Sequence, residues 1–169
     1  MYPRVTTLKT MFASFFPQFK ARVVRDEDAW QIADTTHLLW TDDAINLKRQ
    51  GEYIEACKIY FDQVLRRGAI TSAWASGILK TLAAAGDISD AVAFGFEWYA
   101  SYADKSQLNS DKIVMHLGNL LTLIKNPNNP IMSFPAYLKS ISGSPNYTVD
   151  MNQTDLYTDP MLLSIRNNS

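Results

Sequence analysis

The sequence predicts an all-α fold in which antiparallel helix hairpins stack as a short α-solenoid. Two observations carry this prediction. Apolar residues recur at spacings near 3.6 through residues 35–126, a region that contains no proline. The order glycine, acid, apolar, any residue, acid, alanine occurs twice, as GEYIEA at 51–56 and as GDISDA at 86–91. A pattern that returns after about 35 residues is typical of helix hairpins that stack because no single hairpin buries its apolar face alone.

The composition is that of a globular domain. The chain has 169 residues, of which 47% are hydrophobic and 20% are charged, which suits one domain around a single core. Its net charge of −1 argues against nucleic-acid binding, which depends on a basic surface. The one cysteine, Cys57, excludes an intramolecular disulfide and indicates a reducing compartment such as the cytoplasm. We expect Cys57 to be a small buried residue on a helix.

Residues 1–34 form a basic N-terminal segment, in which no acid precedes Asp26. Its apolar residues include Leu8, Met11, Phe12, Phe15 and Phe16. We expect a helix that ends near Pro17 and lays these phenylalanines on the rest of the domain. An acid-poor, basic and amphipathic start is also typical of an organellar transit peptide. A mitochondrial location is therefore the alternative to the cytoplasm.

Five helices are predicted in the middle region, residues 35–126. Their ranges are 36–49, 53–66, 72–85, 88–102 and 111–125. Gly51 and Gly86 follow the first and third helices, where glycine adopts the left-handed conformation without a Cβ penalty. An acid comes directly after each of these glycines, where it favours the positive end of the next helix. Gly68 is expected to make the remaining short turn.

The last part of the chain, residues 127–169, holds five of the seven prolines and many asparagines and serines. Proline removes a backbone donor and clashes with the preceding helical turn, so this composition does not sustain long helices. We predict an extended, loop-rich C-terminal arm that either orders on a partner or folds back on the helices.

The two copies of the glycine–alanine pattern resemble the tetratricopeptide repeat family over residues 36–125, with 111–125 as a capping helix. The positions that carry the resemblance are Trp40, Ala44, Gly51, Ala56, Tyr60, Trp74, Gly86 and Ala91. In this reading glycine makes the turn inside the hairpin, and alanine lets two helices approach closely where they cross. The second copy departs from the family at Gly95, where an aromatic residue is usual. The alternative is a bundle of five or six helices whose hairpins match by chance.

The resemblance implies a concave groove, lined by the first helix of each hairpin, that holds a peptide. The groove candidates are Leu38, Thr41, Ile45, Lys48, Arg49, Ala73, Ser76, Lys80, Ala83, Met115, His116, Asn119 and Thr122. Chaperone-binding members of the family clamp a C-terminal carboxylate with lysine, arginine and asparagine. Thr41 and Ile45 stand where this clamp would need lysine and asparagine, so we expect an apolar or mixed peptide, or the chain's own tail.

No motif points to catalysis. His37 and His116 lie far apart without companions at metal-ligand spacing, and no phosphate-binding loop or nucleophile motif occurs. The sequence therefore predicts a non-catalytic protein–protein interaction module without cofactor or metal, acting as an adaptor or scaffold. The alternative is a structural subunit of a larger assembly, held through its two terminal arms. A weaker alternative is an RNA binder, because Arg67–Gly68 resembles a turn of the pentatricopeptide family.

Overall fold

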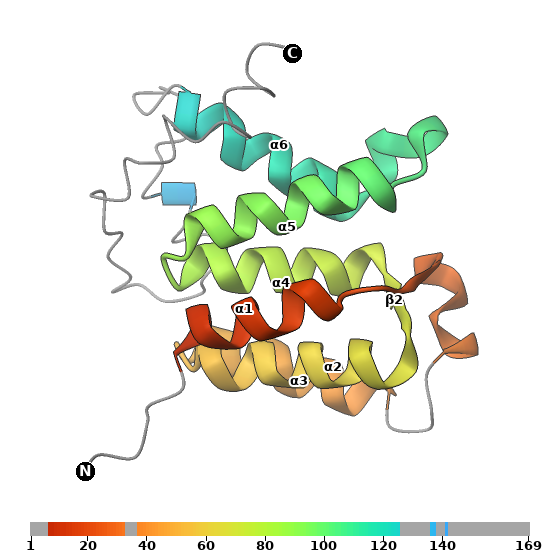
Figure 1. Ribbon diagram of the computed structural model, residues 1–169, viewed down its shortest axis with the longest axis horizontal. Coiled ribbons are helices and arrows are strands. Elements are labelled where there is room, and N and C mark those ends of the chain that lie inside the picture. Colours follow the sequence, from red (N-terminus) through yellow and green to blue (C-terminus); the bar gives the residue numbers. More distant parts are fainter. Residues whose placement is uncertain (1–6, 33–36, 126–135, 138–140, 142–169) are drawn as a thin grey trace.

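The computed structural model describes residues 7–32, 37–125, 136–137 and 141, with the backbone alone at 37–39. In chain order the elements are α1 (Leu8–Gln18), β1 (Arg22–Val24), η1 (Asp26–Gln31), α2 (His37–Arg49), α3 (Tyr53–Arg67), β2 (Ala69–Thr71), α4 (Ser72–Ala84), α5 (Ile88–Ser101), η2 (Lys105–Ser110) and α6 (Lys112–Lys125). Helices make up most of the described chain (Figure 1), so the predicted all-α class is confirmed. No helix in these ranges is long and apolar enough to cross a membrane.

The five helices expected in the middle region are present as α2 to α6, with ends within one residue of the predicted ones. The turns also form as expected. Gly51, Gly68 and Gly86 have φ angles of 82°, 60° and 90°, a left-handed conformation that suits glycine because it has no Cβ. Glu55 and Asp90 lie in the first turns of α3 and α5, at the positive helix ends.

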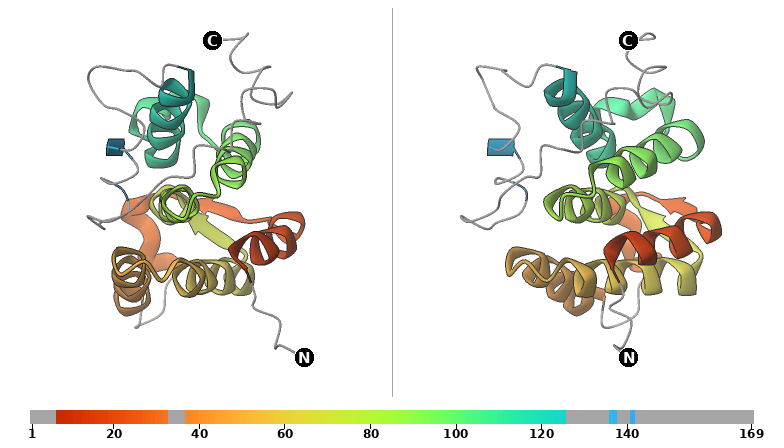
Figure 2. Two further views of the ribbon diagram at one scale, coloured as in Figure 1. Left: turned by 90° about the vertical axis from the view of Figure 1, so that its left-hand side faces the viewer. Right: turned by 60° about the vertical axis from the view of Figure 1, so that its left-hand side comes forward.

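Helices that follow one another in sequence pack against one another. Thus α2 packs on α3, α3 on α4 and α4 on α5, while α6 contacts both α4 and α5. Figure 2 (left) looks along the helices and shows α2 and α6 on one side and α1 and α5 on the other. Contacts between successive helices occur both in stacked hairpins and in helix bundles. Assignment to the tetratricopeptide family remains a prediction.

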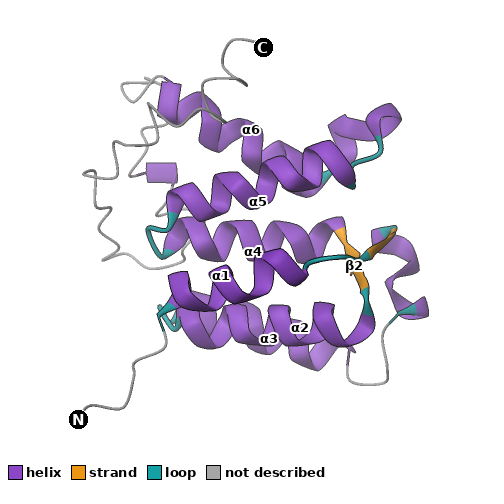
Figure 3. Ribbon diagram, in the orientation of Figure 1, coloured by secondary structure: helices purple, strands orange, loops and turns teal. Residues whose placement is uncertain are grey.

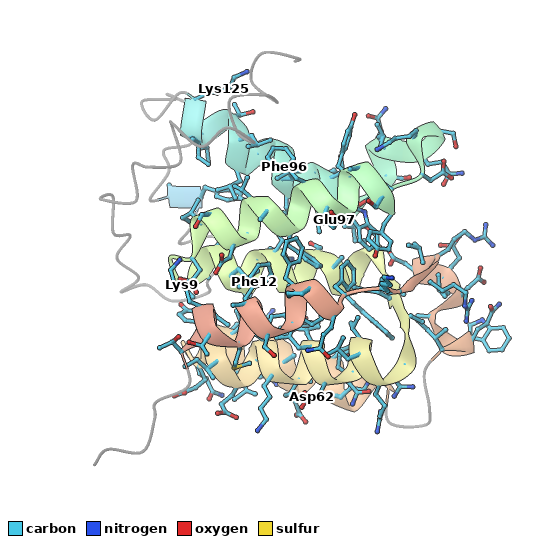
Figure 4. The ribbon with its side chains drawn as sticks, in the orientation of Figure 1. Lys9, Phe12, Asp62, Phe96, Glu97 and Lys125 are labelled. Carbon is cyan, nitrogen blue, oxygen red and sulfur yellow. The ribbon has the colours of Figure 1, made fainter. Side chains whose placement is uncertain are left out.

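The N-terminal helix α1 belongs to the same core. Thr7 caps it by accepting a hydrogen bond from the Thr10 amide at 3.1 Å. The helix packs against α3 and α5, and its Phe15 ring stacks on Phe61 with centroids 4.1 Å apart. Figure 4 shows Phe12 on the side of α1 that faces its neighbours. The expected aromatic packing is therefore present, although α1 continues one residue past Pro17.

A short parallel pair of strands was not expected. β1 pairs with β2 in the register Arg22↔Ala69, Val23↔Ile70 and Val24↔Thr71. Figure 3 shows the pair at one end of the helices, where the chain leaves α3 and enters α4. Strands of three residues are too short for periodicity to reveal. The pair fixes the N-terminal segment to the connection between the two hairpins.

Close packing around Gly95 explains why this position has no aromatic side chain. A Cβ at this position would lie 2.7 Å from Leu117 Cδ1 and 3.1 Å from Leu79 Cδ1. A side chain at this point of α5 would therefore force the leucines of α4 and α6 to shift. The neighbouring aromatic residue Phe96 is instead buried between α5 and α6 (Figure 4).

Candidate functional site

A cavity of about 310 Å³ lies between α2, α4 and α6, and we call it the basic cavity. It is lined by Ile45, Lys48 and Arg49 of α2, Tyr60 of α3, Ala73, Ser76, Gly77 and Lys80 of α4, and Lys112 and His116 of α6. Helical spacing brings these residues to one place, because residues three and four apart share a helix face. No aspartate or glutamate is among the described residues that line the cavity.

The floor of the cavity depends on a close approach between α3 and α4. Tyr60 is 5% exposed, and its ring lies against the backbone of Gly77, where a Cβ would collide with the ring and the hydroxyl. Burial raises the pKa of Tyr60 to about 12, so the hydroxyl stays neutral at physiological pH. Glycine at position 77 is thus what allows an aromatic ring to form the floor.

The cations of the cavity disfavour one another. Burial, together with the charges of Lys80 and Arg49, lowers the pKa of Lys48 to about 8. Burial and the charge of Lys112 also lower the pKa of Lys80. His116 is affected in the same way, because burial and the two lysines lower its pKa to about 4. At pH 7 the cavity therefore holds charged lysines beside a neutral imidazole.

Two polar groups of the cavity residues have no hydrogen-bond partner among the described residues. They are Oγ of Ser76 and Nδ1 of His116, and both atoms are buried. Ser76 as a whole is 2% exposed. Buried polar groups in native proteins are nearly always paired, so each exception needs an explanation.

Contacts at the rim link the cavity to other parts of the chain. Lys112 Nζ lies 3.5 Å from a carboxylate oxygen of Asp26 in η1. Lys48 Nζ donates a hydrogen bond to the carbonyl of Ile141. The Tyr137 hydroxyl donates to the carbonyl of His116 at 3.2 Å. Apart from these isolated positions, the predicted arm at 127–169 lies outside the described residues.

The structure brings together many, but not all, of the groove candidates. Those that line the basic cavity are Ile45, Lys48, Arg49, Ala73, Ser76, Lys80 and His116. Those on the same helices that do not line it are Thr41, Ala83, Met115, Asn119 and Thr122. Ala83 is fully buried. The side chain of Leu38 lies outside the described residues.

Sequence reasoning missed Lys112 and Gly77 as lining residues. Lys112 lies four residues before His116, so helical spacing was a usable signal. The expected helix began at this point, and its first turn was not counted as part of the groove. Gly77 carried no signal, because its role depends on the ring of Tyr60 from another helix.

Six of the eight expected packing positions are buried, and the other two, Gly51 and Gly86, lie in turns. Trp40, Ala44, Ala56, Tyr60, Trp74 and Ala91 are all buried. Trp40 contacts Trp74 edge-to-face, with ring centroids 4.8 Å apart. Cys57 is buried as expected, and burial raises the pKa of its thiol, which makes it a poor nucleophile.

Metal ligation is not indicated in the described ranges, where no group of three or more His, Cys, Asp or Glu residues is placed to hold an ion. The chemistry available at the basic cavity is instead that of hydrogen-bond donors and positive charge. Comparison of the chain with protein-family models, with curated proteins and with solved structures gave no match.

Proposed function

We propose that the protein is a non-catalytic interaction module that holds a segment of a partner protein across α2, α4 and α6. The observation that supports this most directly is the basic cavity, which lies between the three helices that the repeat resemblance assigns to a groove. Its volume of about 310 Å³ is at the lower end of the range for ligand sites. That size suits one anchoring side chain and its neighbours.

Exposed apolar residues beside the cavity suit the remainder of such a segment. Ile45 on α2 is 37% exposed and Met115 on α6 is 53% exposed. Apolar anchors around a polar pocket are a usual arrangement for peptide recognition. Helix α1 covers α3 and α5, whereas the cavity lies on the side of α2, α4 and α6. The alternative of a structural subunit held by its arms stays a prediction, and most of the C-terminal arm lies outside the described residues.

The experiment that tests this function compares two triple variants of the full chain. The groove variant is Lys48→Ala/Arg49→Ala/Lys80→Ala. The control variant is Lys20→Ala/Arg22→Ala/Lys58→Ala, which removes the same charge from exposed positions in the loop after α1, in β1 and in α3. Partners are identified by affinity purification with mass spectrometry, and the bound segment is then mapped by overlapping peptides.

Binding of the mapped peptide to the purified full chain should be lost in the groove variant and kept in the control variant. Circular dichroism of both variants checks that the helices are intact. Equal peptide binding by the two variants would contradict the assignment of the groove. A further check places a photo-crosslinking residue at Met115 or at Ser14 of α1, and only the first should capture the peptide.

A further inference from the structure

We infer that the basic cavity is a binding site for a doubly charged oxyanion, supplied by a phosphorylated side chain of the partner segment. This inference rests on the proposed function and names the ligand group. It differs from the expectation drawn from the repeat resemblance, which favoured an apolar or mixed peptide. Three independent features of the cavity support it: uncompensated positive charge, unpaired donors, and its shape.

The first feature is positive charge without a counter-ion. Lys48 and Lys80 enter from different helices and line one partly buried space. No described carboxylate lines the cavity. The carboxylate of Asp26 lies at the rim, where it pairs with Lys112. Placing like charges together in a partly buried site is unfavourable unless an opposite charge joins them. Burial is the main cause of the lowered pKa values of Lys48 and Lys80, and the charges of neighbouring cations add to it.

The second feature is the pair of unsatisfied groups. Ser76 Oγ carries a hydrogen that no described acceptor takes, and His116 Nδ1 is likewise unpaired. A hydroxyl, an imidazole nitrogen and two ammonium groups together supply more donors than one carboxylate oxygen can accept. A phosphate presents three acceptor oxygens and close to two negative charges at neutral pH. One such group neutralises both lysines and satisfies the buried serine.

The third feature is the enclosed shape, which favours a peptide over RNA. Proteins that bind single-stranded nucleic acid use an extended basic groove with exposed aromatic rings for base stacking. Here the cations converge on one cavity. Tyr60, the one aromatic residue among its described lining residues, is buried in the floor, and the chain has a net charge of −1. A single phosphate on a peptide fits this arrangement, whereas a run of phosphates does not.

The first experiment uses inorganic phosphate as the probe and the full chain as the protein. Phosphate is titrated at pH 7.5 and constant ionic strength, with chloride and acetate as matched anions, and followed by calorimetry and NMR of the His116 ring. We expect saturable binding of phosphate that exceeds that of acetate, with a shift of the His116 resonances. Equal responses to phosphate and chloride would overturn the inference.

Two single variants and one control locate the site. We expect Lys80→Met to weaken phosphate binding about tenfold or more, because a hydrogen bond to a charged group is lost. Ser76→Ala should weaken it by a smaller factor of about three to ten. Lys58→Met, on the exposed face of α3, should leave it unchanged. Unchanged binding in a folded Lys80→Met protein would contradict the site.

The second experiment identifies the source of the anion. The mapped partner peptide is compared in three forms, with serine, glutamate or phosphoserine at one position, alongside an RNA oligonucleotide of equal charge. Tighter binding of the phosphoserine form supports the inference, and tighter binding of the RNA overturns it. If the unmodified peptide binds as tightly as the phosphoserine peptide, the result supports the interaction module and contradicts the phosphate site. If phosphate binds but no peptide does, the result supports the anion site and contradicts the proposed function.

Discussion

The positive charge of Lys80 has opposite effects on anion binding and on the stability of the fold. It is partly buried near Lys48, Lys112 and His116, so its charge disfavours the folded state while serving an anionic ligand. We expect Lys80→Met to raise the free energy of unfolding in phosphate-free buffer by about 0.5–1 kcal/mol, a small gain because solvent screens the charge. Urea denaturation of this variant and of Lys58→Met measures it. A loss of stability would show that the ammonium group is needed for the fold itself.

His116 provides a test at acid pH. Its pKa is about 4 in the folded chain and about 6.5 when unfolded. Between these values the unfolded chain binds more protons, so this residue's contribution to stability is present above pH 6.5 and is lost as the pH falls towards 4. After allowance for solvent screening we expect a loss of about 1 kcal/mol.

The matched measurement for this prediction compares wild type with His116→Gln between pH 7 and 4. Burial raises the pKa values of Asp87 and Asp90, and these carboxyls act in the opposite direction in both proteins. The difference between the two pH profiles therefore isolates the histidine. Parallel profiles would contradict the prediction.

Lys48 sets the upper limit of the pH range for anion binding. Its pKa of about 8 means that it loses its charge as the pH rises from 7 to 9, while a phosphomonoester such as phosphoserine stays close to doubly charged. The charged groups around it are Arg49 on α2, Lys80 on α4, and Lys112 on α6, next to neutral His116 and Tyr60. We expect the affinity for a phosphomonoester such as phosphoserine to fall about tenfold across this range. Affinity that is constant to pH 9.5 would contradict a role for Lys48.

At the scale of the helix, Gly95 limits how α5 packs. A Cβ at this position would meet the ends of Leu117 and Leu79, both of which are buried and have little room to move. We expect Gly95→Ala to destabilise the protein by about 1–2 kcal/mol through overpacking. Gly118→Ala on α6 is the matched control, because nothing lies within 4 Å of its added methyl group. The control should instead gain up to about 1 kcal/mol from helix propensity.

Helices and turns could be predicted from the sequence where a few neighbouring residues determine them. The periodicity of residues 53–66 and the positive φ angles of Gly51 and Gly86 depend on a few neighbouring residues. The parallel pair β1–β2 depends on residues about 47 positions apart, and three residues leave no period to read. The same limit applied to the cavity: Lys48, Ser76 and Lys80 were predicted from the repeat resemblance, whereas the floor made by Tyr60 and Gly77 depends on the approach of two helices.

At the scale of the whole molecule, Asp111 joins three helices at one end of the stack. Its carboxylate accepts hydrogen bonds from the Trp98 indole at 2.9 Å, the Ser72 hydroxyl at 2.8 Å and the Val114 amide at 3.2 Å. These donors belong to α5, α4 and α6 respectively. The Ser72 hydroxyl in turn accepts from the Lys112 amide at 2.9 Å. α6, which carries Lys112 and His116, is therefore held in place relative to α4 through this residue.

We expect Asp111→Ala to lower the free energy of unfolding by about 2–4 kcal/mol, because it removes a helix cap and leaves the indole of fully buried Trp98 unpaired. Asp111→Asn should lower the free energy of unfolding by less. Its amide oxygen still caps α6, and only one of the two oxygen acceptors is replaced. The indole also reports the change directly, through the fluorescence and the NMR shift of Trp98.

Because Asp111 positions α6, phosphate binding in folded Asp111→Ala should fall together with stability, whereas Gly95→Ala should lower stability with less effect on binding. Equal loss of binding in both variants at equal stability would show that the basic cavity responds to overall stability and not to the placement of α6.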